Sequence, residues 1–260
     1  MPKATAGLVV AGWLIAGLTT AAPDAAPAAT KVAEGDAALA KLDLAGAMAA
    51  YTAAVDSSPN DYEALWKLAR ALADEATLAK DSRAQKDLCI RAEKLARKSV
   101  SVKPNDSKGH AYLAVAVGKL ALFEGGKRKV ELSKEVKAEA ERALQCNADD
   151  DVALHVLAIW NREMVELSWF LRSFAQMLYG KFPPASLDTA LADLRRAVQL
   201  RPDVIPHHVE LGITLASAKR WPEAKTELEK GLALPTGWVT DDYYRALGRQ
   251  NLARVQAHLR

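Results

Sequence analysis

The sequence contains few of the residues that most often carry chemistry at protein sites. Its 260 residues include only two cysteines and five histidines, and aromatic residues make up 6%. Cys89 and Cys146 fall at different positions of different predicted helices, so we expect no disulfide bridge between them. The formal net charge is +3, with both signs mixed along the chain, which is unlike the clustered basic surface of nucleic-acid-binding proteins. We therefore expect no nucleic-acid partner, no metal and no other cofactor.

Arginine is absent from the first 30 residues. Lys3 precedes an apolar run over residues 4–18, and an Ala/Pro-rich stretch then ends at Ala29. We expect residues 1–29 to be a secretory signal peptide, which would make the folded part exported or periplasmic. Counted as far as Ala22, the run approaches the roughly 20 residues that span a bilayer, so a membrane anchor is the alternative. The lack of arginine disfavours a mitochondrial transit peptide.

A spaced pattern of small and larger residues that ends in proline recurs along the chain. Its occurrences share one phase. They are Ala47, Tyr51, Ala54 and Pro59, then Ala92, Ala96, Ser99 and Pro104, and then Ala190, Leu194, Ala197 and Pro202. Small residues let two helices approach closely, and the proline ends the second helix, as in the second half of a tetratricopeptide repeat. We predict an all-α, right-handed tetratricopeptide-repeat solenoid over residues 30–260. It would have about five helix pairs and a capping helix from Asp241.

The repeat period is interrupted in repeats two, three and four. Pro104 lies farther from Pro59 than the roughly 34 residues of a standard repeat, and a second insertion surrounds Gly125-Gly126. In the fourth repeat about 20 extra residues separate the two helices. Apolar residues between Met164 and Leu178 keep a spacing of three to four, which predicts that the first helix extends well past normal length before Gly180.

The fourth repeat carries the most specific segment of the chain. It reads Trp160-Asn-Arg-Glu163-Met-Val-Glu-Leu167-Ser168-Trp169-Phe-Leu-Arg172, followed by Leu178-Tyr179-Gly180-Lys181 and Pro183. Together with Gly125-Gly126-Lys127 and Val130-Glu131-Leu132-Ser133, it resembles the regulator of microtubule dynamics family over about residues 51–235. Arg162 stands where that family usually has an aromatic residue, and Leu171 stands where it usually has an acid.

The resemblance implies a helical-repeat adaptor that is not an enzyme, and animal members of the family are associated with microtubules and organelle membranes. If residues 1–29 are a signal peptide, the folded part does not meet cytosolic microtubules. Microtubule binding is then not expected of this chain, and a partner in the envelope fits the leader better.

The first helices of the repeats would line the concave face of such a solenoid, where partners usually bind. We expect a protein segment of unknown identity to contact Trp66, Arg70, Lys119, His155, Ile159, Arg162, Glu163 and Glu166. A clamp for acidic C-terminal peptides also needs matched asparagines, which are missing. Glu163 and Glu166 share one helix face, but no nucleophile or metal-ligand spacing accompanies them, so we expect no catalysis.

The insert of the fourth repeat supplies the alternative hypothesis. Aromatic and methionine residues between Trp160 and Met177 would either fill a widened core or line a groove for a helix or an acyl chain. Trp169 and Phe170 are adjacent and diverge by about 100° on a helix, so at least one of them is a candidate contact residue, with Arg172 beside them. A carrier of lipid or another hydrophobic ligand is therefore the second hypothesis. The basic run 127–129 is a candidate contact for an anionic membrane surface.

Overall fold

The computed structural model describes residues 25–167, 173, 176, 177, 180 and 184–260. Within these ranges it contains eleven helices with described bounds and no strand. The helices are α1 (Ala25–Leu39), α2 (Leu44–Ser57), α3 (Tyr62–Leu78), α4 (Ser82–Val102), α5 (Ser107–Ala121), α6 (Gly126–Cys146), α7 (Asp151–Glu166), α9 (Leu187–Leu200), α10 (Ile205–Ser217), α11 (Trp221–Ala233) and α12 (Asp241–Leu259). None of the helices in the described part of the chain is both long enough and apolar enough to cross a membrane.

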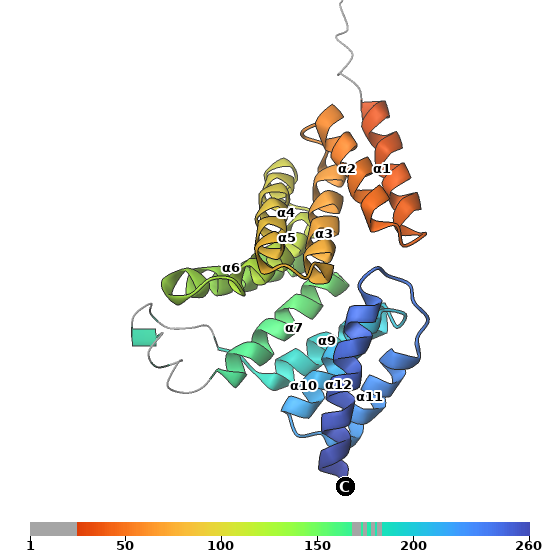
Figure 1. Cartoon of the computed structure of the whole chain (residues 1–260). Helices are drawn as coiled ribbons and strands as arrows, with labels where there is room; N and C mark the ends of the chain where they lie inside the picture. Colours follow the sequence, from red (N-terminus) through yellow and green to blue (C-terminus); the bar gives the residue numbers. More distant parts are fainter. Residues whose placement is uncertain (1–24, 168–172, 174–175, 178–179, 181–183) are drawn as a thin grey trace, which may run out of the picture.

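The helices pack as consecutive antiparallel pairs, which Figure 1 shows in order along the chain. The pairs are α1 with α2, α3 with α4, α5 with α6, α7 with α9, and α10 with α11. The last helix, α12, packs on α11 and α10 as a cap. The first helices α3, α5, α7 and α10 also contact one another in sequence, so they form the inner layer of a solenoid. The predicted architecture of five helix pairs and a capping helix is confirmed.

The spaced small residues hold each pair together. Fully buried positions in the second helices include Ala47, Tyr51 and Ala54 in α2, Ala92, Ala96 and Ser99 in α4, and Ala190, Leu194 and Ala197 in α9. In the pairs α1–α2 and α10–α11, the first helix carries glycine where a larger residue of the second helix packs. A Cβ on Gly35 would lie 2.4 Å from the ring of Tyr51, and a Cβ on Gly212 would lie 2.6 Å from Leu228. Glycine at these positions therefore lets the two helices approach closely.

Aspartates begin several of the helices. The side chains of Asp61, Asp81 and Asp106 each accept a hydrogen bond from a backbone amide in the first turn of the following helix. Asp150 does the same for Ala153 at 3.1 Å. Such N-caps satisfy amides that have no partner within the helix and contribute about 1 kcal/mol each.

The insertions of repeats two and three appear mainly as longer second helices. Helices α4 and α6 have 21 residues each, whereas α2 has 14. Cys89 on α4 and Cys146 on α6 are both free, as expected. Trp160 of α7 packs against the extended α6, where its Nε1–H donates to the Ser133 carbonyl oxygen at 2.8 Å. This residue is therefore part of the core.

The prediction that the first helix of repeat four extends far into the insert is wrong. Helix α7 ends at Glu166, and the next residue, Leu167, has a ψ of 125°, which is outside the helical region. A tertiary contact fixes where the chain returns, because the Ser186 amide donates to Asn161 Oδ1 at 3.2 Å. Ser186 then caps α9, so the second helix of the repeat begins beside α7.

The first helix begins before the domain boundary expected at residue 30. Helix α1 starts at Ala25, and Ala28 is fully buried. A cleavage next to Ala29 would therefore shorten α1 by about one turn.

Candidate functional site

Aromatic and charged side chains gather where the inner faces of α3 and α5 meet. The rings of Trp66 and Tyr112 are stacked, with centroids 5.4 Å apart and planes 7° from parallel. The guanidinium of Arg70 lies 5.5 Å from the Trp66 ring centroid and 6.0 Å from that of Tyr112. Cations at such distances are attracted by the negative faces of aromatic rings. This part of the concave face can hold flat or extended groups against Arg70.

The connection between α11 and α12, which is far along the chain from α3, packs against the same part of the concave face. Residues 234–240 are not helical, and the side chains of Trp238 and Val239 pack against the core of the first repeats. The indole Nε1–H of Trp238 donates to Asp74 Oδ2 at 3.1 Å, and Arg70 Cζ lies 4.6 Å from the Trp238 ring centroid. Figure 1 shows this connection between the C-terminal helices and the N-terminal pairs. We call Arg70, Asp74, Trp66 and Tyr112 the indole slot.

The charges at the indole slot are poorly solvated. Burial raises the pKa of the Asp74 carboxyl to about 6, although Arg70, Lys119 and the Trp238 indole act in the opposite direction. Burial likewise lowers the pKa of the Lys119 ammonium, whose Nζ donates to the Thr77 hydroxyl at 2.6 Å. The Nε atom of Arg70 is buried and has no hydrogen-bond partner in the described residues. The slot therefore retains a donor that the described part of the chain does not satisfy.

A buried ion pair joins the fourth repeat to the fifth on the same face. Arg162 Nη1 on α7 donates to Glu210 Oε2 on α10 at 2.6 Å and to the Thr214 hydroxyl at 3.1 Å. Arg162 and Glu210 are each 6% exposed. Because both charges are removed from water, the pair is a structural contact between the two repeats.

Two histidines lie next to that ion pair. His155 Nδ1 is 3.0 Å from His207 Nδ1, and His207 Nε2 is 3.1 Å from Asp151 Oδ2. Burial lowers the pKa of His155 well below its usual value, and the neighbouring cations act in the same direction. A neutral His155 can donate from Nδ1 to His207 while His207 donates from Nε2 to the carboxylate. Nowhere in the described ranges do three or more His, Cys, Asp or Glu side chains form a potential metal site.

The predicted contact residues differ widely in exposure. Trp66, Arg70, Lys119 and Ile159 are partly exposed, Glu163 and Glu166 are exposed, and His155 and Arg162 are buried. Glu163 also lies 3.4 Å from Arg162 Nη2, and the Ser217 hydroxyl donates to Glu166. These eight side chains come from α3, α5 and α7, as predicted. Their role in binding a partner stays a prediction.

Trp169, Phe170 and Arg172 lie outside the described residues. The hypothesis of a lipid or hydrophobic-ligand carrier depends on them and stays a prediction as well.

Three members of this region, Asp74, Tyr112 and Trp238, were not predicted from the sequence. Asp74 follows Arg70 by one helical turn, so its position on the same face was available from the helical period. Trp238 lies in the connection before α12, where no repeat phase applies. Its contact with Asp74 spans 164 positions of the chain.

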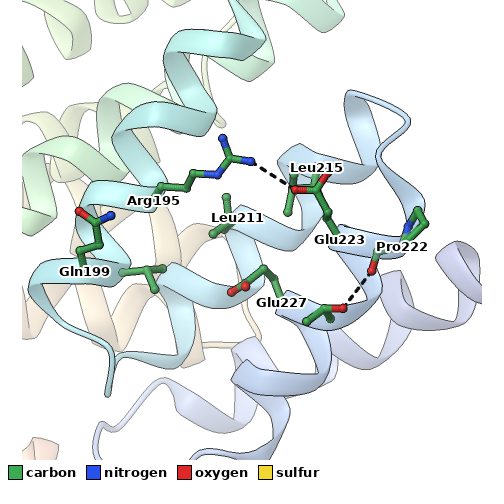
Figure 2. Close-up of a pocket in the computed structure, with 9 residues that line it drawn as sticks. Arg195, Gln199, Leu211, Leu215, Pro222, Glu223 and Glu227 are labelled. Carbon is green, nitrogen blue, oxygen red and sulfur yellow. Dashed lines mark hydrogen bonds and ion pairs between the residues drawn. The ribbon is translucent and has the colours of Figure 1, made fainter.

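A second concavity lies on the other side of the solenoid, between α9 and α11 (Figure 2). It has a volume of about 410 Å³, with Leu211 and Leu215 of α10 at its base. The charges at its edge pair with each other, because Glu223 lies 3.4 Å from Arg195 and 2.6 Å from Arg220. Ligands would have to break these ion pairs, which makes this groove the weaker candidate site.

Comparison with known proteins identifies the relatives of this chain. The family model described as Regulator of microtubule dynamics protein 1-3 matches residues 31–253. Regulator of microtubule dynamics protein 1 of Pongo abelii is 30% identical over 144 residues, which is 55% of this chain and 46% of that protein. The protein of the same name in Caenorhabditis elegans is 25% identical over 177 residues, which is 68% of this chain and 78% of that protein. The chain thus spans about half the length of the mammalian relatives it matches.

Solved structures share the fold at low sequence identity. A thermophilic tetratricopeptide-repeat protein of Thermus thermophilus superposes with a TM-score of 0.61 at 18% identity, covering 87% of this chain and 99% of that one. The type IV pilus biogenesis factor PilW gives a TM-score of 0.53 at 16% identity, covering 89% and 91%. The family match covers most of the repeats described above. The chain therefore belongs to the regulator of microtubule dynamics family and has a tetratricopeptide-repeat fold.

Proposed function

We propose that this chain is a non-enzymatic scaffold that binds an extended segment of a protein partner along its concave face. The family and the fold support a protein-interaction role for the solenoid as a whole. One observation carries the assignment to the concave face. The non-helical residues 234–240 already lie against α3 there, with one side chain held by a hydrogen bond and a cation–π contact. This contact supports the proposal that the face accommodates a non-helical stretch of chain.

The open part of this face is acidic. The side chains of Glu63 on α3 and Glu163 on α7 are 58% and 57% exposed, and Glu166 is exposed one turn after Glu163. Each of the first two also contacts a basic side chain of the same helix, because Glu63 Oε1 lies 2.6 Å from Lys67 Nζ and Glu163 Oε1 lies 3.4 Å from Arg162 Nη2. Arg162 and Glu210 differ in that both are buried. Charge complementarity therefore favours a partner segment that carries lysine or arginine.

Site-specific photo-cross-linking in the organism's own cells tests this proposal. A photoreactive residue at position 63 or 163 should capture one specific partner. The same residue at Ile90, which is 43% exposed on the second helix α4, is the control and should not capture it. Capture from all three positions alike would contradict binding on the concave face.

The captured partner then provides a quantitative test. A recombinant fragment of it should bind the purified chain, and Glu163→Gln should weaken this binding at least tenfold without changing the unfolding midpoint. This variant is informative because Glu163 is exposed, so removing its charge leaves the core intact. Unchanged affinity would exclude Glu163 from the interface.

The place of action is a separate part of the proposal. We propose that the chain acts outside the cytosol, on the basis of the apolar segment in residues 1–29. The N-terminal residue of the protein isolated from its own cells tests this. The names of the curated relatives refer to microtubule dynamics. An intact Met1 together with co-sedimentation with microtubules would therefore favour a cytosolic role instead.

A further inference from the structure

The indole slot points to the kind of segment that the concave face recognises. We propose that Arg70, Asp74, Trp66 and Tyr112 form a binding site for a tryptophan-bearing, non-helical segment of a protein partner. The chain's own Gly237–Val239 segment occupies this site until the partner displaces it. This inference rests on the function proposed above, and adds the chemistry of the ligand and the way access to the site is controlled.

The occupying segment is shaped by contacts with the helix that follows it. The Asp241 carboxylate accepts hydrogen bonds from the amides of Gly237 and Trp238, both at 2.8 Å. Arg245 donates to the Leu234 carbonyl oxygen and to the Thr236 hydroxyl, both at 2.7 Å. These contacts tie residues 234–238 to α12, so they persist when the indole leaves the slot. Trp238 is therefore presented to α3 as a ligand on a preformed turn.

The slot matches an indole on two sides. Asp74 Oδ2 accepts from the Nε1–H at 3.1 Å, and the Arg70 guanidinium lies 4.6 Å from the ring centroid. Trp66 and Tyr112 stack behind Arg70 and support its position. Phenylalanine would lack the N–H donor, and a lysine or arginine would meet the charge of Arg70. Of these side chains, only tryptophan both donates to Asp74 and stacks on Arg70.

The chain's own segment does not satisfy the slot completely, because the buried Nε–H of Arg70 has no hydrogen-bond partner among the described residues. A buried donor without a partner is costly, so an incoming segment that brings both a tryptophan and an acceptor for Arg70 gains a bond that Trp238 does not provide. Such a gain is needed, because a tethered segment competes with an effective concentration in the millimolar range. Displacement then follows from the difference in affinity of the two segments for one site.

Fluorescence anisotropy of a labelled peptide tests the inference on the full chain. The probe is a nine-residue peptide with the sequence of residues 234–242, Leu-Pro-Thr-Gly-Trp-Val-Thr-Asp-Asp. It should bind the Trp238→Ala protein saturably below about 1 mM and the unchanged protein at least tenfold more weakly, since the slot is occupied there. The double variant Trp238→Ala/Asp74→Ala and the same peptide with alanine in place of tryptophan should both lose binding.

Two further variants guard against a loss of structure in Trp238→Ala. Trp238→Phe fills the same space without the N–H donor, and it should bind the peptide with an affinity between those of the unchanged and the Trp238→Ala proteins. Trp221→Ala is the matched control, because it removes an indole that contacts His258 on α12, with ring centroids 4.2 Å apart, away from the slot. It should bind the peptide as weakly as the unchanged protein.

The outcomes separate this inference from the function on which it rests. Equal binding by the unchanged and Trp238→Ala proteins, or no binding by Trp238→Ala up to about 1 mM, overturns the inference. If cross-links from positions 63 and 163 still identify a partner, the proposed function stands without it. If the peptide binds as expected but no partner cross-links to the concave face, the slot is an internal clasp and the proposed function fails.

Discussion

The ion pair between Arg162 and Glu210 gives the sharpest test of how the fourth and fifth repeats are joined. Its two charges are 2.6 Å apart, with side chains 7% and 8% exposed. Removing one partner from such a pair costs about 3–5 kcal/mol, because the remaining charge stays buried. Without Glu210, Arg162 keeps only the 3.4 Å contact to the exposed Glu163 and the hydrogen bond to Thr214. We therefore expect Glu210→Ala to lower the free energy of unfolding by about that amount.

Two matched variants separate the loss of a pair from the loss of a single charge. The double variant Arg162→Met/Glu210→Leu removes both charges and retains most of the volume, so its stability should lie within about 1.5 kcal/mol of the unchanged protein or exceed it. Arg97→Ala is the surface control. It removes ion pairs with Glu93 and Glu135 in which the arginine side chain is 43% exposed, so it should cost under about 1 kcal/mol.

Urea unfolding followed by far-ultraviolet circular dichroism measures these differences. If the unfolding free energy depends on urea concentration with the same slope in each variant, the same unit unfolds in all of them. If Glu210→Ala costs no more than Arg97→Ala, or if the double variant is as unstable as the single one, the ion pair is not the contact that joins these repeats. The reasoning from burial would then be refuted.

Two further predictions follow from other parts of the solenoid. Burial raises the pKa of Asp74 from 3.8 to about 6, so the folded state holds this proton more tightly than the unfolded state. The unfolding free energy of the unchanged protein, relative to that of Asp74→Asn, should therefore fall by up to about 3 kcal/mol as pH rises from about 4 to 7. If this relative free energy rises with pH instead, the burial of Asp74 is refuted. Gly35→Ala places a Cβ 2.4 Å from Tyr51 and should cost about 1–3 kcal/mol in urea unfolding, whereas Gly237→Ala, with nothing within 4 Å, should cost little.

The repeat architecture was predictable because one local rule is applied many times. Ala47, Tyr51 and Ala54 keep their spacing in later repeats, and their positions are fully buried. The end of α7 was not predictable from the same kind of pattern. The apolar period continues past Met164, but Leu167 leaves the helical region, and the chain returns to α7 through the contact between Asn161 and Ser186. Periodicity reports what a segment can form, and here it did not predict where the helix ends.

The candidate site was predictable only where it follows the repeat phase. Trp66 and Arg70 occupy first-helix positions that face inward, so they could be assigned to the concave face from spacing alone. Trp238 reaches the same place because the solenoid curves until the connection before α12 meets α3. That curvature depends on the angles between successive pairs, which are set by side-chain packing between the repeats. No pattern within one repeat contains this information.

The pairing of charges on the concave face decides which residues a partner can use. Arg162 and Glu210 already satisfy each other, so a partner that bound Arg162 would have to break a buried ion pair first. Arg70 differs, because its Nε has no acceptor among the described residues, and Glu163 differs because its carboxylate is exposed. Substitution of Arg162 should therefore reduce partner binding only as far as it unfolds the chain, whereas Glu163→Gln should reduce binding at unchanged stability. Measuring affinity and unfolding free energy on both variants distinguishes these cases. A stable Arg162→Met/Glu210→Leu protein that fails to bind would show that the partner contacts Arg162 or Glu210 directly.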